Sequence, residues 1–171
     1  MPTSETNSEP QLLWVVAHTR PRAEKKLADW CRKQGFEVTL PVFKSVKKYA
    51  SKTAVFEKPL FPNYLFLKLA RDQNRLVYQS DYVANVLEVN DQALFEQQLG
   101  DILRALDSDV EIMLAPRLVA GSRVAIKNGP LRGLEGSVEQ RSGRTLVHLR
   151  LDFISQAAAV LIDAGDLEPL D

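Results

Sequence analysis

One strand with large apolar side chains on both of its faces constrains the fold of this chain more than any other segment. Between residues 64 and 69, three leucines alternate with two aromatic residues and a lysine, which is the period-two pattern of a β-strand. We expect the leucine face to belong to the core. Pro59 and Pro62 lack amide donors and fix φ, so the chain enters this strand through an extended kink. The aromatic face needs its own cover, which is either a helix or a partner protein.

Further strands are predicted on both sides of this one. Apolar and β-branched residues predict strands at 12–18, 36–40 and 82–89. The segment 42–56 reads as a hairpin or loose loop with a basic tip, and residues 71–80 have loop or short-helix character.

Two amphipathic helices complete the N-terminal part. The first begins near Pro21 and ends at Gly35, and the second is capped by Asn90 or Asp91 and reaches Leu106. Each has a single apolar stripe, and we expect both stripes to cover the leucine face. The predicted fold is therefore an α+β domain, a mostly antiparallel sheet with helices on one face.

The composition changes after an acidic segment that reads as a linker. Beyond it, short apolar groups alternate with glycine-rich turns, including a pair at Leu151 and Phe153 that predicts a strand. Five short strands in about fifty residues predict a small all-β barrel of SH3-like type. The predicted boundaries are a disordered tail at 1–11, an α+β domain at 12–107, a linker at 108–117 and the small barrel at 118–171.

Charge and residue chemistry exclude several classes of protein. The formal net charge is zero, although residues 20–58 carry eleven Lys/Arg against four Asp/Glu and residues 81–111 carry the opposite excess. The single cysteine, Cys31, excludes an internal disulfide and a Cys-based zinc site. His18 and His148 have no metal-ligand spacing around them, and no nucleophile motif or P-loop is present. We expect no enzyme, no cofactor and no metal, and without a signal peptide or an apolar span we expect a cytoplasmic protein.

Two groups of residues resemble a known family. The segments 121–126 and 128–138 look like a KOW motif, whose glycines at 129, 133 and 136 we expect to adopt positive φ. Trp14-Val15-Val16, Leu40-Pro41 and the segment 59–66 resemble the N-terminal (NGN) domain of NusG-type transcription elongation factors. The sequence Leu-Phe-Pro-Asn-Tyr-Leu-Phe most resembles that of the specialised RfaH-like paralogues.

The resemblance implies a non-enzymatic, monomeric factor that rides on bacterial RNA polymerase and reaches the nucleoid through it. Its N-terminal domain would dock on the clamp coiled coil of the largest subunit and suppress pausing or modulate termination. Residues near the first helix would pass the non-template DNA strand. The KOW domain would bind a ribosomal protein or a termination factor. A KOW-type protein that binds RNA or the ribosome without touching polymerase is the alternative.

Site residues follow from the resemblance, position by position. The clamp-docking residues are Trp14, Phe61, Pro62, Tyr64 and Phe66. The DNA-contacting residues are Arg20, Arg22, Lys25, Lys26, Arg71, Asn74 and Arg75. The KOW partner would meet Phe153 and Ile154, but the following Ser155-Gln156-Ala157 replaces the Gly-Arg pair common in the family and leaves the partner's identity open. The competing interpretation is that the aromatic residues pack under a helix and the cations are solvated surface charges.

Overall fold

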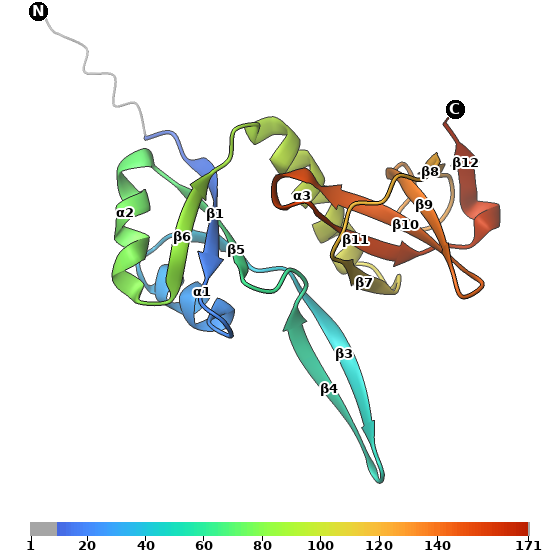
Figure 1. The fold of residues 1–171 in the computed structure, drawn as a ribbon, viewed down its shortest axis with the longest axis horizontal. Helices are drawn as coiled ribbons and strands as arrows, with labels where there is room; N and C mark the ends of the chain where they lie inside the picture. Colours follow the sequence, from blue (N-terminus) through green and yellow to red (C-terminus); the bar gives the residue numbers. More distant parts are fainter. Residues whose placement is uncertain (1–9, 171) are drawn as a thin grey trace, which may run out of the picture. The chain divides into compact units, whose positions relative to one another are not determined.

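The computed structural model describes residues 10–170, with all side chains in that range except those of residues 46 and 47. The predicted tail, residues 1–11, lies outside the described residues apart from its last two. The chain divides into two compact units, each described by itself (Figure 1). One contains the residues up to Thr39 together with Asn63–Val89, and the other contains Leu40–Pro62 and the residues from Asn90 onward.

The first unit is built on a four-stranded antiparallel sheet in the order β2-β5-β1-β6. Its strands are β1 Leu13–Thr19, β2 Glu37–Thr39, β5 Tyr64–Leu69 and β6 Val83–Glu88. The three strands predicted around the central one are therefore confirmed. The leucine face of β5 is buried as expected, because Leu65, Leu67 and Leu69 are at most 1% exposed.

Helix α1, Glu24–Lys33, packs against β2 and β5 of this sheet. It buries Leu27, Ala28 and Cys31 completely and ends before Gly35, whose φ of 82° suits a residue without a side chain. The segment predicted as loop or short helix folds as three short turns. They are η1 Arg71–Gln73, α2 Asn74–Val77 and η2 Tyr78–Ser80.

Of the two alternatives for the segment 42–56, the structure shows the hairpin, folded as a two-stranded ribbon. Strands β3, Val42–Tyr49, and β4, Lys52–Pro59, pair in one uninterrupted antiparallel register (Figure 1). Because β4 extends to Pro59, strand β5 begins only after a turn at Leu60–Asn63.

The C-terminal strands form a six-stranded antiparallel sheet in the order β12-β8-β9-β10-β11-β7. They are β7 Ile112–Ala115, β8 Arg123–Ile126, β9 Glu135–Arg141, β10 Arg144–Leu151, β11 Gln156–Leu161 and β12 Leu167–Pro169, with turns η3 Asp152–Ile154 and η4 Ala164–Asp166. The all-β character of this part is as predicted. Strand β7 lies inside the segment predicted as linker, and it extends the sheet beyond β11.

Two details of the predicted strands are wrong. Leu151 is the last residue of β10, and Phe153 lies in η3, because Ser155 adopts a left-handed φ of 54° and closes a tight turn on the Asp152 carbonyl. The fifth strand within residues 118–171 is instead β12.

Helix α3, Gln92–Leu106, also differs from its predicted position. Its cap is as predicted, since the Asp91 side chain accepts a hydrogen bond from the Leu94 amide at 3.0 Å. Its apolar stripe, however, faces β10 and η3, so the expectation that it covers the leucine face of the first sheet is wrong.

The KOW glycines have two different functions. Gly129 and Gly133 adopt positive φ, 87° and 93°, as predicted. Gly136 does not: it lies in β9, where a Cβ would collide with the carbonyl oxygen of His148 on β10. It therefore permits a close approach of two strands rather than a left-handed turn.

Candidate docking face and basic residues

The register between β1 and β5 places three of the predicted docking residues on one face of the sheet. Trp14 lies opposite Lys68, Val16 opposite Phe66, and His18 opposite Tyr64. Directly opposed residues of antiparallel strands point to the same side. Strand β6 adds Leu87 opposite Val16 and Asn85 opposite His18. We call these eight residues the docking face.

Ring contacts fix both ends of the docking face. At one end the ammonium of Lys68 lies 4.9 Å from the centre of the Trp14 ring, a cation–π contact. At the other end the rings of His18 and Tyr64 stack with centres 5.3 Å apart. His18 was not among the predicted site residues, although its even position in the same strand as Trp14 could have indicated it.

The docking face is accessible mainly at its Tyr64 end. Phe66 is 0% exposed and Trp14 is 8% exposed, whereas Tyr64 is half-buried and His18 and Leu87 are exposed. Phe61, which precedes the strand, is 1% exposed. Trp14 and Phe66 are therefore less accessible to a partner than Tyr64.

The turn that leads into β5 is held by three hydrogen bonds. The Leu60 amide donates to the Pro41 carbonyl at 2.8 Å. Asn63 adopts a φ of 71°, which asparagine tolerates better than most residues. Its amide donates to Oε1 of the buried Glu24 at 2.9 Å, and its carbonyl accepts from the Thr19 amide at 2.8 Å. Pro62 remains exposed between these anchors.

The predicted DNA-contacting cations are on the surface of the first unit. Arg20, Arg22, Lys25 and Lys26 are exposed around the start of α1, and Arg71 and Arg75 are exposed on η1 and α2. Asn74 differs, because its side-chain amide donates to Glu88 Oε1 at 3.2 Å and the residue is half-buried.

A small pocket next to α1 was not predicted. It has a volume of about 220 Å³ and is lined by Lys26, Asp29, Trp30, Lys33 and Tyr82. The sequence signal was weak, since Tyr82 lies 49 positions after Lys33, the last residue of the helix.

The two residues predicted to meet the KOW partner lie in η3 and are not equally accessible. Ile154 is 9% exposed and belongs to the buried core, so little of its side chain is accessible to a partner. Phe153 is half-buried and meets Phe95 of α3 edge to face, with ring centres 6.2 Å apart. The Asp152 amide next to it donates to Gln98 Oε1 at 2.9 Å. Helix α3 thus occupies part of this surface.

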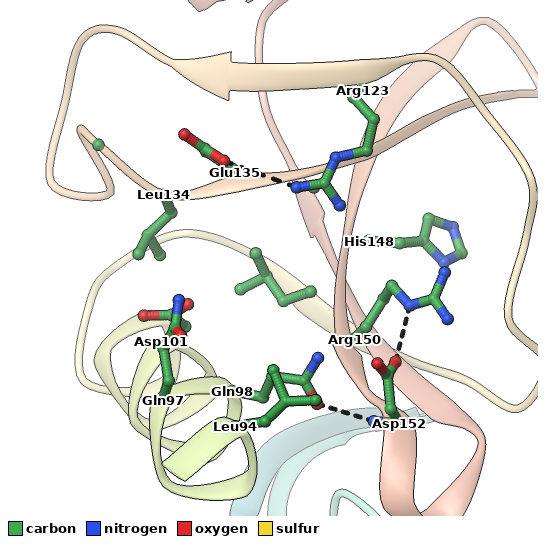
Figure 2. Close-up of a pocket in the computed structure, with 13 residues that line it drawn as sticks. Leu94, Gln97, Gln98, Asp101, Arg123, Leu134, Glu135, His148, Arg150 and Asp152 are labelled. Atoms are coloured by element: carbon green, nitrogen blue, oxygen red, sulfur yellow. Dashed lines mark hydrogen bonds and ion pairs between the residues drawn. The ribbon is translucent and has the colours of Figure 1, made fainter. Parts of the chain in front are cut away.

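A larger pocket of about 500 Å³ lies beside α3 (Figure 2). Its charged side chains are largely paired: Arg150 Nε donates to Asp152 at 2.8 Å, and Arg123 lies 3.5 Å from Glu135. Burial raises the pKa of Asp101, and the nearby Arg104 charge acts against that rise. Burial also disfavours the charged form of Asp152, but hydrogen bonds from Arg150 and Gln98 outweigh it and lower the pKa.

A buried histidine links β9 and β10 near this pocket. His148 is 1% exposed, and its Nε2 lies 2.5 Å from Glu139 Oε2. The bond to His148, helped by Arg141, lowers the pKa of Glu139. Among residues 10–170, no cluster of three or more His, Cys, Asp or Glu is arranged to hold a metal ion. No helix in the same range is long and apolar enough to cross a membrane.

Comparisons with known proteins converge on one family. The family model described as transcription termination factor nusG matches residues 12–100, which is more than half of the chain. A protein of Rickettsia prowazekii named transcription termination/antitermination protein NusG is 28% identical over 186 positions, covering 100% of this chain and 95% of that protein. The protein of the same name from Rickettsia typhi is 27% identical over 154 residues, covering 82% of this chain and 79% of the relative.

Proposed function

The chain belongs to the NusG family, and from that premise we propose that it is a transcription termination/antitermination factor that docks on bacterial RNA polymerase through its N-terminal sheet. Members of this family are transcription factors rather than enzymes, which agrees with the absence of a nucleophile motif in the sequence. The finer proposal is that the docking face meets the clamp coiled coil of the largest subunit.

The observation that carries this proposal is the stacked pair of His18 and Tyr64. Rings held rigidly at an accessible sheet face are typical anchors of a protein interface, because they lose little conformational freedom on binding. The exposed Leu87 lies beside them and adds apolar area to the same surface. Trp14 and Phe66 are buried and would support the surface rather than touch the partner.

The test is binding of the full chain to the purified clamp coiled coil. We expect Tyr64→Ala to weaken binding at least about thirtyfold, the effect of losing about 2 kcal/mol at an interface anchor. Tyr49→Ala is the matched control, because Tyr49 is 58% exposed on the hairpin and outside the docking face. Phe61→Ala is a poor probe, since removing a ring that is 1% exposed would destabilise the fold itself.

Undiminished binding by the Tyr64 variant would refute the docking face as the polymerase contact. Absence of binding by the unaltered chain would favour the alternative, a KOW-type protein that binds RNA or the ribosome without polymerase.

We propose in addition that the exposed cations around α1 and α2 contact the non-template DNA strand. Arginine near a helix start is suited to phosphate, since the backbone donors there add to its charge. Reversing Arg20, Arg22 and Arg75 to Glu should reduce crosslinking of the polymerase-bound factor to the non-template strand without weakening its binding to the isolated coiled coil. Unchanged crosslinking would contradict this role.

The C-terminal sheet is proposed to recruit a ribosomal protein or a termination factor. Phe153 is the residue best placed to contribute, because it is only half-buried, whereas Ile154 is in the core. Any partner that needs the whole Phe153 ring competes with Phe95 for it.

A further inference from the structure

We propose that the β3–β4 hairpin is a second nucleic-acid contact, which binds duplex DNA through its phosphates without reading its sequence. This inference goes beyond the proposed function, which uses the docking face and the cations near α1 and α2. It concerns residues that neither of those roles employs.

The hairpin is a ribbon whose strands pair extensively only with each other among the described residues. Eight cross-strand pairs run from Val42 and Pro59 at the base to Tyr49 and Lys52 at the tip. A two-stranded hairpin is marginally stable in water, because it has no second layer in which to bury its side chains. This ribbon nevertheless exposes large apolar groups, with Tyr49 and Val55 each 58% exposed and Phe56 42% exposed. A partner that covered these groups would stabilise the hairpin.

The register distributes aromatic rings and lysines along one face of the ribbon. Tyr49 lies opposite Lys52, and Phe43 lies opposite Lys58, so the members of each pair share a side. Phe56, opposite Ser45, lies between these two pairs on the same face. Planar apolar rings interleaved with ammonium groups match a polymer of bases and phosphates better than they match a purely apolar protein surface.

The charge of the hairpin favours a polyanion. Five lysines and one glutamate lie between residues 42 and 59. Lys52 lies on the face that carries Tyr49 and Phe56. Lys44 and Lys48 alternate with those residues and lie on the opposite face of the ribbon. All three lysines are exposed, and Lys48 and Lys52 lie on either side of the turn at the tip, so both faces of the ribbon carry charge. Duplex DNA presents one negative charge per ~1.7 Å of its axis, so several cations on one ribbon can each meet a phosphate.

The shape of the hairpin also fits a duplex. A two-stranded β-ribbon is one of the two elements that the major groove, ~12 Å wide, admits. Eight residues of strand span about 26 Å, so the tip can enter the groove while lysines nearer the base reach phosphates at its rim. An acidic protein surface would satisfy the charges but offers no comparable groove.

The test measures binding of the full chain to two labelled 20-bp duplexes of unrelated sequence by fluorescence anisotropy. We expect the triple variant K44Q/K48Q/K52Q to bind both duplexes at least about tenfold more weakly at ~50 mM salt. The slope of log K against log salt should fall by about 2.7, the loss of three phosphate contacts. The matched control is R117Q/K127Q/R132Q, which removes three exposed cations elsewhere in the same unit and should leave binding within about twofold.

A double variant tests the contribution of the aromatic rings separately from that of the lysines. Tyr49→Ser combined with Phe56→Ser leaves every lysine in place. Compared with the unaltered chain, it should bind the duplexes a few-fold more weakly, with the salt slope unchanged. Circular dichroism of each variant checks that the rest of the chain remains folded.

Four outcomes would overturn the proposal. The first is an unaltered chain that does not bind duplex DNA at low salt, and the second is equal loss in the control triple variant. The third is loss confined to R20Q/R22Q/R75Q, which would place the contact in the other unit. The fourth is tighter binding of a single strand or of polyglutamate than of the duplex, which would assign the ribbon to another partner.

Discussion

Two aromatic pairs lie on the surfaces predicted to meet partners, and they are in opposite situations. His18 and Tyr64 stack on neighbouring strands, and their outer side remains accessible. Phe153 meets Phe95, which is 2% exposed on helix α3. The first pair is part of an accessible sheet surface, and the second is part of the contact between helix α3 and the turn η3. An apolar ring is thus open to a partner only if no other element of the chain has an apolar stripe to place on it.

The comparison predicts that the two pairs differ most in their effect on stability. Phe95→Ala should lower the free energy of unfolding of the C-terminal unit by about 3–5 kcal/mol, because it removes a buried ring and leaves a cavity. Tyr64→Ala should cost much less. Urea denaturation of both variants, followed by circular dichroism, measures the difference, and equal losses would show that the Phe95 contact is superficial.

The reactivity of Cys31, which lies in the first unit, measures whether the destabilisation caused by Phe95→Ala stays in the other unit. Burial raises its pKa from 9.0 to about 11, with Arg32 acting weakly in the opposite direction. Below pH 9 this rise alone reduces the reactive thiolate about a hundredfold relative to an exposed thiol. Labelling by iodoacetamide at pH 8 should therefore be slow in the native chain and equally slow in Phe95→Ala. Fast labelling in that variant would mean that the two units unfold together.

The stacked pair should contribute a smaller, measurable coupling. A double-mutant cycle of His18→Ala and Tyr64→Ala should give about 0.5–1.5 kcal/mol of interaction energy in the unfolding free energy. The cycle of Trp14→Ala and Lys68→Ala provides a reference at the other end of the docking face. A coupling near zero would mean that the rings are not held rigidly, which would weaken the argument for an anchor.

The smallest expected effect is a pH-dependent contribution of Glu139 to the stability of the C-terminal sheet. The folded-state pKa of Glu139 is lowered, so its bond to His148 contributes stability above the unfolded pKa of about 4.5 and loses it as pH falls through the lower folded value. Glu139→Gln should reduce the melting temperature slightly at pH 7 and not at all well below pH 4.5. A difference that persists in acid would attribute the effect to packing rather than to the charge.

Much of the first unit could be predicted because its residues carry local signals. The alternation at 64–69 gave strand β5 and its buried face, and the glycine at 35 marked the end of α1. The shared face of Tyr64 and Phe66 follows from the same alternation. Their different exposure does not, because depth depends on what packs above each ring, and that is decided by residues far away in the sequence.

The misplaced features share one physical cause. An amphipathic helix shows which of its sides is buried but not which surface buries it, so the stripe of α3 was assigned to the wrong sheet. Phe153 was predicted to lie in a strand, but the left-handed φ of Ser155 closes a turn there. Gly136 resembled its neighbours in the motif, and only the carbonyl of a partner strand explains why a glycine is there.

Strand β11 shows how far neighbours can decide a conformation. Its middle residues, Ala157, Ala158 and Ala159, are at most 1% exposed, and alanine has the highest intrinsic preference for a helix. The segment is extended because β10 pairs with it on one side and β7 on the other. Its extended backbone is therefore determined by pairing with the neighbouring strands and not by the intrinsic preference of its residues. Loosening β7 would remove half of the hydrogen-bonding frame that keeps these alanines from their own local preference.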